Sequence, residues 1–167
     1  VLALISRVFD DGFTSRLQRV LREERGLVYS VECRATSMSD LGTMDFDVTV
    51  RPEKVVEVSR ILLQEIKTFA TEGPTESELA HIKKRYFFDL DSELDDPYKQ
   101  VVRYAFPHLY SSEMSLQEER ELIESITANK MMEVAEKVFE AKNLNLILVG
   151  PYTSELKSRL EGLIHQF

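Results

Sequence analysis

Residues 10–31, with the sequence DDGFTSRLQRVLREERGLVYSV, contain the turn, helix and strand patterns that decide the fold. The opening Asp-Asp-Gly triplet is typical of a turn, and apolar side chains then recur at helical spacing from Phe13 to Leu21. Gly26 follows the basic end of this helix, as glycine often does at a helix C-terminus. A strand-like run follows at residues 28–37. The segment therefore predicts a turn, a helix and a strand in immediate succession.

The rest of the chain predicts an α+β fold, with a small, mainly antiparallel sheet packed against several helices. Residues 43–51 alternate apolar and polar side chains, which is typical of a half-buried strand that completes an antiparallel hairpin. The apolar run at residues 143–150 predicts a third, buried strand. Apolar periodicity and capping residues predict helices over approximately residues 52–71, 75–90, 97–109, 115–125, 127–139 and 154–167.

Particular residues are expected to begin or interrupt these helices. Thr75 and Ser115 are each followed by a glutamate three positions later, the pattern of a capping box. Thr127 is expected to cap the helix that follows it. Pro107 is expected to kink or end its helix, because proline lacks the N–H that an interior helical position donates.

The number of strands and the first residues indicate an incomplete unit. The chain begins at Val1 without an initiator methionine, inside an apolar stretch that has no signal-peptide pattern. A hairpin and one further strand would leave a sheet edge unpaired, and additional strands would cover it. We therefore expect residues 1–167 to form a single domain of a longer protein, truncated at its N-terminus so that its N-terminal strands are missing.

Length and composition exclude several classes of protein. The 167 residues, 43% hydrophobic and 30% charged, are typical of one globular domain and exclude disordered and fibrous proteins. The balance of 21 Lys and Arg against 29 Asp and Glu, a net charge of −8, argues against nucleic acid as a partner. No apolar run reaches the roughly 18 residues of a membrane helix, so no membrane partner is expected. Cys33 is the single cysteine, which excludes an internal disulfide.

The residue types that commonly carry catalysis are scattered. His81, His108 and His165 stand far apart, and neither His-x-x-x-His nor His-x-x-Glu-His occurs. Glu78 and His81 have Glu-x-x-His spacing, but a carboxylate-bridged metal site needs a second such motif, so a solvated helix face is favoured. Cys33 lies within a strand-like run without a nucleophile motif, which favours a small buried hydrophobe. We expect this chain to bind no metal and no other cofactor.

The order of the motifs resembles the C-terminal half of the pitrilysin-like, or insulinase-type, zinc metallopeptidases, a family that includes mitochondrial processing peptidase. The match is densest at residues 14–17 and 21–30, where Thr-Ser-Arg-Leu precedes LREERGLVYS. It continues in the same order through Arg-Pro-Glu-Lys at 51–54, Gly-Pro-Thr-Glu-Ser-Glu-Leu at 73–79 and the apolar run that ends at Gly150. The chain departs from the family at Asp10-Asp11-Gly12, where a run of glycines is usual.

The resemblance implies a division of labour between two halves. The N-terminal half carries His-x-x-Glu-His and a distant glutamate that bind zinc, whereas the C-terminal half lacks these ligands and helps to enclose the peptide. The family places an arginine and a tyrosine of this half at the active site, and they match Arg22 and Tyr29. Both are suited to donate hydrogen bonds to a substrate carbonyl or oxyanion.

The residues themselves also admit simpler interpretations. By strand alternation Tyr29 shares a face with Val31, as a core tyrosine would. Arg22 lies off the apolar stripe of its helix, as a solvated charge would. Arg16 matches a family position too, and we expect it to be structural, joining the start of the helix to a neighbouring carboxylate.

Two functional hypotheses follow. In the first, the chain is part of a zinc metalloendopeptidase: it helps to bind peptide and supplies Arg22 and Tyr29, but is inactive alone. In the second, it is a non-catalytic pitrilysin-like subunit that binds polypeptide or scaffolds a complex. The expected partners are a zinc-bearing N-terminal half, on the same or a separate polypeptide, and a peptide substrate, with a dimer left open. The expected location is the cytoplasm, with the periplasm and the mitochondrion left open.

Overall fold

An antiparallel hairpin forms the sheet of the computed structural model, which describes residues 1–38, 40–109 and 112–167. In this hairpin β1 (Val28–Ser37) pairs with β2 (Gly42–Val50). The longer helices are α1 (Leu2–Phe9), α2 (Val55–Glu72), α3 (Glu76–Ser92), α4 (Pro97–Leu109), α5 (Leu116–Ser125), α6 (Ala128–Val138) and α7 (Ser154–His165). A π-helical segment, η1 (Gln18–Glu23), precedes β1, and short 3₁₀ turns form η2 (Pro52–Lys54), η3 (Glu93–Asp95) and η4 (Ala141–Asn143). The fold is α+β, as predicted.

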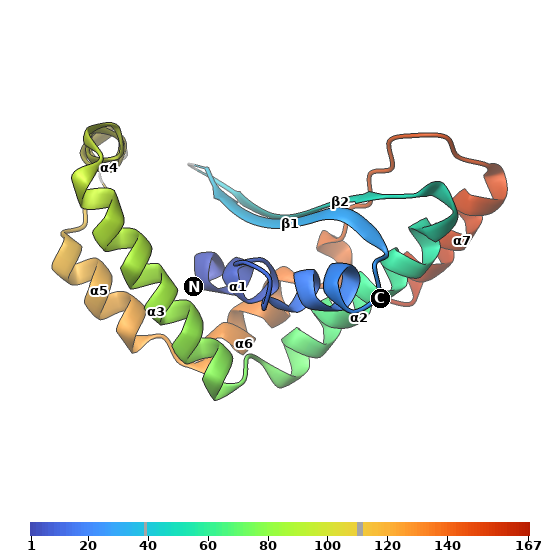
Figure 1. Cartoon of the computed structure of the whole chain (residues 1–167), viewed down its shortest axis with the longest axis horizontal. Coiled ribbons are helices and arrows are strands. Elements are labelled where there is room, and N and C mark those ends of the chain that lie inside the picture. The colour runs from blue at the N-terminus through green and yellow to red at the C-terminus, as the bar shows by residue number, and fades with distance from the viewer. Residues whose placement is uncertain (39, 110–111) are drawn as a thin grey trace.

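The hairpin has one apolar and one polar face, as the alternation of its second strand predicts. Met44, Phe46 and Val48 of β2 are half-buried and pack against the main core, whereas the polar residues between them are exposed. Val31 and Cys33 of β1 are buried in the same core. Figure 1 shows α1, α2 and α6 on one side of the hairpin, and the apolar face packs toward these helices.

The main core centres on Phe9, which is fully buried at the end of α1. Its ring centroid lies 5.2 Å from that of Phe46, 5.1 Å from that of Phe69 and 6.1 Å from that of Phe139. Tilted and edge-on aromatic pairs at such distances stabilise a core beyond the area they bury. Segments far apart in the sequence therefore meet at Phe9, which holds α1 beneath the hairpin.

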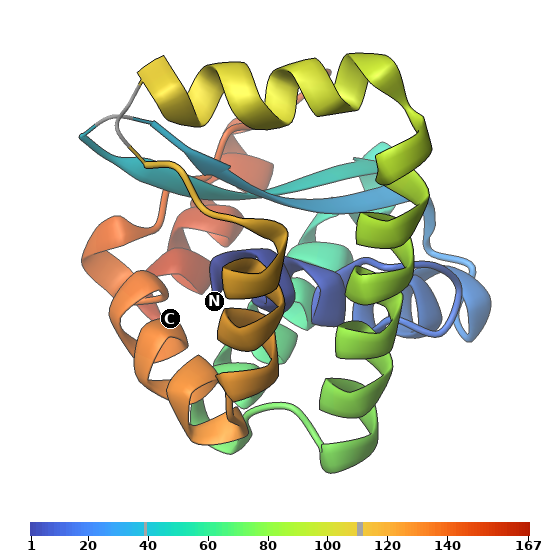
Figure 2. The same ribbon diagram turned by 90° about the vertical axis from the view of Figure 1, so that its left-hand side faces the viewer.

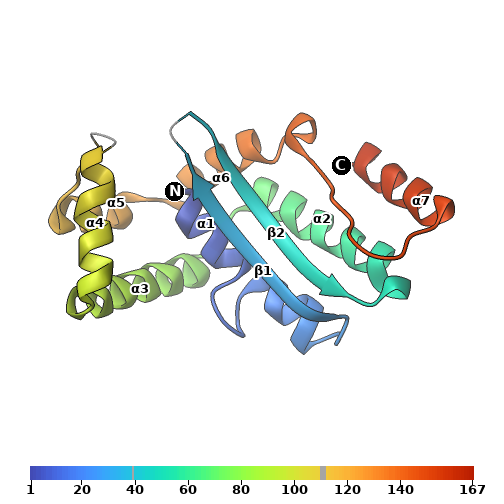
Figure 3. The ribbon, with the colours of Figure 1, turned by 90° about the horizontal axis from the view of Figure 1, so that it is seen from above.

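The remaining helices extend from this core in two directions. At one end α7 packs against α2 through Val55, Val56 and Leu160, which form a second, smaller buried cluster. At the other end α3 lies against α1 and α5, and α4 lies beyond them at the edge of the molecule (Figures 2 and 3). No residue of α4 is buried. Among the residues that the structure describes, none of the helices combines the length and apolarity needed to cross a membrane.

Three predicted helix starts are confirmed. The Thr75 hydroxyl accepts a hydrogen bond from the N–H of Glu78, whose carboxylate in turn accepts one from the N–H of Thr75 at 2.8 Å. Ser115 and Glu118 form the same reciprocal pair at the start of α5. Thr127 caps α6 by accepting a hydrogen bond from the N–H of Lys130. Each cap satisfies donors that the first helical turn leaves unpaired.

The prediction of a third, buried strand at residues 143–150 is wrong. The 3₁₀ turn η4 covers its first residue, and residues 144–150 then pass from α6 to α7 outside the sheet (Figure 3). A strand needs a neighbour to share its backbone hydrogen bonds, and in the described part of the chain β1 and β2 pair only with each other. Ile147 and Val149 are consequently 85% and 92% exposed.

The start of one helix differs from the periodicity. Phe13 does not lie on the apolar helix face: it is 71% exposed in the turn before the helix, which starts at Arg16. Gly12, with φ +92°, and the hydrogen bond from the N–H of Ser15 to the Gly12 carbonyl at 3.0 Å form that turn. The predicted helix at 97–109 is found as α4 (Pro97–Leu109), and Pro107 lies inside it, so the helical residues that the structure describes extend past the proline.

Candidate functional site

Arg22 lies near the end of the helical segment that leads into β1. In η1 the N–H of Glu24 donates to the carbonyl oxygen of Arg19 at 2.9 Å, an i→i+5 hydrogen bond. Such π-helical turns re-aim the side chains that follow and occur often at functional sites. Leu21 is fully buried, whereas the Arg22 side chain is 46% exposed and its guanidinium lies 3.9 Å from the Glu23 carboxylate. Arg22 therefore presents its donors at the surface.

A β-bulge at the start of β1 places Tyr29 outside the core. Val28 pairs with Val50 and Ser30 pairs with Thr49, so Tyr29 is the extra residue that has no partner across the hairpin. Val28 and Val31 are both buried, whereas Tyr29 is 84% exposed. The bulge thus interrupts the alternation that would bury Tyr29 beside Val31. The interpretation of Tyr29 as a core residue is wrong.

The backbone turn between η1 and β1 fixes the positions from which the Arg22 and Tyr29 side chains project. The N–H of Leu27 donates to the Leu21 carbonyl at 2.8 Å, and the N–H of Gly26 donates to the Arg22 carbonyl at 3.0 Å. Gly26 has φ +58°, a left-handed conformation that favours glycine. Across the described residues, no hydrogen bond joins the Arg22 and Tyr29 side chains. One turn therefore presents a cationic donor and a neutral donor, both accessible from solvent.

Arg16 is structural, as expected. Its guanidinium forms two hydrogen bonds with the Glu78 carboxylate, at 2.7 and 2.8 Å, and a third with the Gly73 carbonyl at 2.9 Å. The Arg16 side chain is 11% exposed. Although partial burial acts to raise it, hydrogen bonds from Arg16 and Thr75 lower the pKa of Glu78 to about 2. Glu78 thus joins the start of the helical segment at residues 16–23, which we call the site helix, to the start of α3.

The loop before the site helix carries Phe13, which the apolar periodicity places on a helix face. Phe13 stands exposed in the loop, and the Arg22 guanidinium carbon lies 6.0 Å from the centre of its ring. That distance is at the limit of a cation–π contact. The turn pattern Asp-Asp-Gly was the available signal, because a turn that extends past Gly12 removes Phe13 from the helix.

The residues considered as metal ligands or nucleophiles have other surroundings. Glu78 is occupied by Arg16, and His108 Nδ1 lies at 2.5 Å from the Glu113 carboxylate on an exposed surface. Burial, together with the nearby carboxylates of Asp10 and Asp45, raises the pKa of the Cys33 thiol. Within residues 1–38, 40–109 and 112–167, no three His, Cys, Asp or Glu side chains group as metal ligands.

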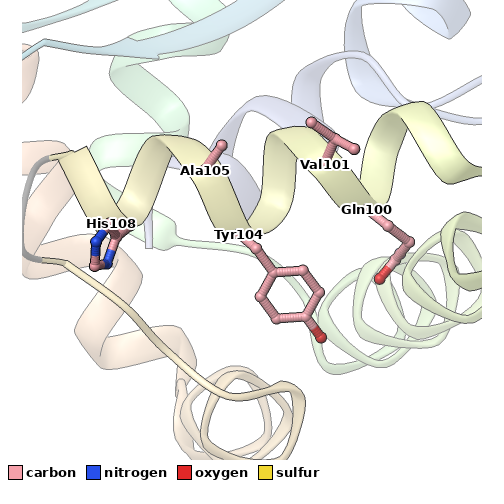
Figure 4. Close-up of a pocket in the computed structure, with 5 residues that line it drawn as sticks. All are labelled: Gln100, Val101, Tyr104, Ala105 and His108. Atoms are coloured by element: carbon pink, nitrogen blue, oxygen red, sulfur yellow. The ribbon is translucent and has the colours of Figure 1, made fainter.

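A separate apolar surface lies on α4. A shallow hollow there is lined by Gln100, Val101, Tyr104, Ala105 and His108 (Figure 4). Figure 4 shows Val101 and Ala105 projecting from one side of the helix and Tyr104 and Gln100 from another. Val101 and Tyr104 are 64% and 61% exposed. The hollow belongs to one helix and combines few polar groups, so it is not a candidate catalytic centre.

Comparison with known proteins gives a family and several relatives. The model of the family described as peptidase M16 inactive domain matches residues 1–86. An uncharacterized zinc protease of Mycobacterium tuberculosis is 26% identical over 166 residues, which cover 98% of this chain and 38% of that protein. The chain therefore spans well under half the length of this curated relative.

Solved structures share the fold. A peptidase M16 inactive domain from Pseudomonas fluorescens superimposes with a TM-score of 0.73 at 22% identity, covering 81% of this chain and 33% of that one. A chain of complex III2 from Candida albicans gives a TM-score of 0.70 at 19% identity, covering 81% of this chain and 35% of that one. At these identities the similarity shows the fold, including the arrangement of the hairpin and the helices.

Proposed function

Because the chain belongs to the peptidase M16 inactive domain family, we propose that it is the non-zinc-binding half of a zinc metalloendopeptidase. In this role it helps to bind the peptide and supplies Arg22 and Tyr29 to a site whose metal is held by the other half. The chain is inactive alone under this proposal, which is supported by the lack of a metal-ligand group among the described residues.

The observation that carries the proposal is the exposure of Tyr29. A large aromatic side chain at the start of a strand packed on the core is expected to be buried. Here a bulge turns it outward to 84% exposure, one short turn away from Arg22. β-bulges often re-aim a side chain beside an active site. The resemblance to the pitrilysin-like peptidases assigns active-site roles to these same two residues.

The chemistry of peptide hydrolysis suits these donors. Attack on the scissile carbonyl develops negative charge on its oxygen, and donors already in place lower the barrier. The Tyr29 hydroxyl donates one hydrogen bond while remaining neutral near pH 7. The Arg22 guanidinium is a permanent cation with several donors and also suits a backbone carbonyl of the peptide. Tyr29 is assigned to the oxyanion, and Arg22 to the oxyanion or a neighbouring carbonyl.

Exposed apolar surfaces support a partner half. Ile147 and Val149 lie in the unpaired segment 144–150, and Val101 and Tyr104 lie on α4. Large exposed apolar patches are uncommon on free monomers and often mark interaction surfaces. A second half of similar architecture that closes over a peptide would have such surfaces available to it.

The proposal is tested by Tyr29→Phe in the assembled protein, the zinc-bearing half included. Peptide hydrolysis should fall by about 10²–10³, as it does when one oxyanion donor is removed. The measurement is kcat and kcat/KM with a quenched fluorescent peptide. The free energy of unfolding should change by less than about 0.5 kcal/mol, because the hydroxyl is exposed and without a structural partner.

Tyr98→Phe is the matched control, since Tyr98 is 76% exposed on α4, is not one of the two assigned donors and keeps its apolar ring for any contact of α4 with the partner half. It should leave hydrolysis unchanged. If Tyr29→Phe also turns over peptide at the parental rate, Tyr29 has no role in catalysis.

The second candidate is a non-catalytic subunit that binds polypeptide or scaffolds a complex. It is favoured by the fold shared with a chain of complex III2 and by the exposed apolar surfaces described above. The sequence encoded upstream of this chain, or in an adjacent gene, distinguishes the peptidase from the scaffold. His-x-x-Glu-His encoded upstream, or in an adjacent partner gene, supports the peptidase; its absence from both places supports the scaffold.

A further inference from the structure

The loop between α1 and the site helix is held on both sides of Phe13. The Asp10 carboxylate accepts hydrogen bonds from the N–H of Cys33 at 3.1 Å and from the Gln18 amide at 3.0 Å. The Gln18 amide also donates to the Val31 carbonyl at 2.8 Å, so these side chains cover part of the outer edge of β1. Figure 3 shows the loop beside that strand. The entry to the loop is therefore fixed to the hairpin.

Asp11 fixes the same loop to the helices. Its carboxylate is 12% exposed and lies 3.1 Å from the Arg7 guanidinium and 3.4 Å from that of Arg85. After Phe13, the Ser15 hydroxyl donates to the Gly12 carbonyl at 2.6 Å. Ion pairs with α1 and α3 on one side and a closed turn on the other leave Phe13 at the tip of an anchored loop.

At this tip an aromatic ring is presented to solvent beside the candidate site. Phe13 is 71% exposed, yet the Arg22 guanidinium lies 6.0 Å from its ring centre. The ring thus lies at the limit of a cation–π contact with Arg22, and most of its surface faces solvent. An anchored aromatic side chain makes apolar contacts at a low cost in conformational entropy, because it has only two side-chain torsions to fix.

We propose that Phe13 is a specificity-determining residue of the Arg22–Tyr29 site, where its ring contacts an apolar or aromatic side chain of the bound peptide. This inference rests on the proposed function, and it adds the substrate class: peptides with a large apolar side chain close to the scissile bond. Offset or edge-on packing of two rings adds affinity that an alanine in the same peptide position does not provide. The Asp10 and Asp11 contacts act as positioning interactions, because they hold the loop that carries the ring.

The experiment uses the assembled protein and pairs of fluorescent peptides that differ only in Phe or Ala at one position, scanned along the residues beside the scissile bond. The readouts are kcat/KM for cleavage and Kd from fluorescence anisotropy. For at least one position, the parent protein should prefer the Phe peptide, and Phe13→Ala should lower that preference by about tenfold, the scale of one apolar contact. Phe13→Tyr should retain the preference, because it keeps the ring.

Phe88→Ala is the matched control, since Phe88 is 66% exposed on α3 and its side chain is not among those that hold the loop, so it should leave both readouts unchanged. Thermal unfolding of each variant checks that the fold is retained. A Phe-over-Ala preference in kcat/KM and Kd that is the same in Phe13→Ala and the parent overturns the inference, as does the absence of any preference in the parent.

Failure of the proposed function is recognised separately. If Tyr29→Phe leaves cleavage unchanged, or no peptide is cleaved, while Phe13→Ala still lowers the preference in Kd, the catalytic assignment is wrong and the Phe13 contact stands. If Tyr29→Phe cleaves slowly and Phe13→Ala keeps the parental preference, the catalytic assignment of Tyr29 stands and the Phe13 contact is overturned. If the assembled protein neither cleaves nor binds any peptide of the panel, both are overturned.

Discussion

Glu78 connects two elements through a single carboxylate. It accepts a hydrogen bond from the N–H of Thr75 in the capping box of α3 and two from the Arg16 guanidinium at the start of the site helix. Such a pair is stronger than a surface ion pair because the Arg16 side chain is only 11% exposed and holds the carboxylate in a bidentate geometry. Sequence spacing predicts the cap, and the expected structural role of Arg16 predicts a carboxylate partner.

This pair predicts a pH dependence of stability. The pKa of Glu78 is lowered to about 2 in the folded protein, whereas an unfolded glutamate titrates near 4.3. The stabilisation is therefore complete above about pH 5 and is lost as the pH falls toward 2, because the unfolded chain takes up the proton first. With Glu78 29% exposed, solvent screening reduces the effect to about 1–2 kcal/mol. Urea unfolding at pH 7 and pH 3 should show Glu78→Gln losing this amount at pH 7 and about half of it at pH 3, where the folded carboxylate is still largely ionised.

Glu118→Gln provides the matched control. Glu118 forms the same capping box with Ser115, but its side-chain hydrogen bonds are to Ser115 rather than to an arginine. Its substitution should therefore have the smaller effect at pH 7. Equal losses in the two variants, or a loss in Glu78→Gln that does not depend on pH, would contradict the role assigned to the Arg16–Glu78 pair.

Among the elements, those with strong local patterns follow from the sequence. The alternation of β2 gives its buried face, and Thr75, Ser115 and Thr127 begin helices where their side chains predict caps. The bulge at Tyr29 does not follow, because no local pattern distinguishes a bulged residue from its neighbours in a strand. The π-helical turn of η1 is equally unpredictable from the sequence, since Leu21 is buried there as it would be in an α-helix and only the backbone hydrogen bonds differ.

The segment 144–150 shows the opposite case, in which a strong pattern does not make a strand. Its apolar run favours a buried strand, yet strand structure also requires a partner, which local sequence cannot provide. The same dependence applies to Arg22 and Tyr29. The structure gives their exposure, whereas their assignment to a site comes from the resemblance and from a partner half. The order of the motifs in the sequence therefore predicts that Arg22 and Tyr29 belong to a site, and the structure explains why both side chains are accessible.

The exposure of this segment predicts a small stability effect. Ile147→Ala should change the free energy of unfolding of the 167-residue chain by less than about 0.5 kcal/mol, because Ile147 is 85% exposed. Ile82→Ala is the control: Ile82 is 3% exposed, and its truncation should cost about 2–5 kcal/mol. Urea unfolding measures both. In a longer protein whose additional strands pair with residues 144–149, Ile147→Ala should cost more than in this chain. A large cost already present in the 167-residue chain would show that Ile147 is buried there.

At the scale of the whole molecule, the buried core and the candidate site occupy different parts of the fold. The Phe9 cluster and helices α1, α2 and α6 lie on one side of the hairpin, and the candidate site lies on the turn that leads into its first strand. The apolar surfaces left uncovered are on α4 and on the segment between α6 and α7. A domain arranged in this way can support a site to which it contributes only hydrogen-bond donors. The location of the metal is therefore the property that most directly tests the division between two halves.

Zinc should accordingly remain with the other half. A zinc site in a protein needs three or four ligands in one place. In this chain His81 lies on α3, His108 lies on α4 and pairs with Glu113, and His165 lies at the end of α7. After incubation with equimolar zinc and desalting, elemental analysis of the isolated, folded chain should find less than about 0.1 zinc per chain, whereas the assembled peptidase should hold about one per site. Chelation should abolish hydrolysis by the assembly and leave the unfolding temperature of the isolated chain unchanged. Stoichiometric, tightly held zinc in the isolated chain would contradict both the division of labour and the assignment of the metal to the other half.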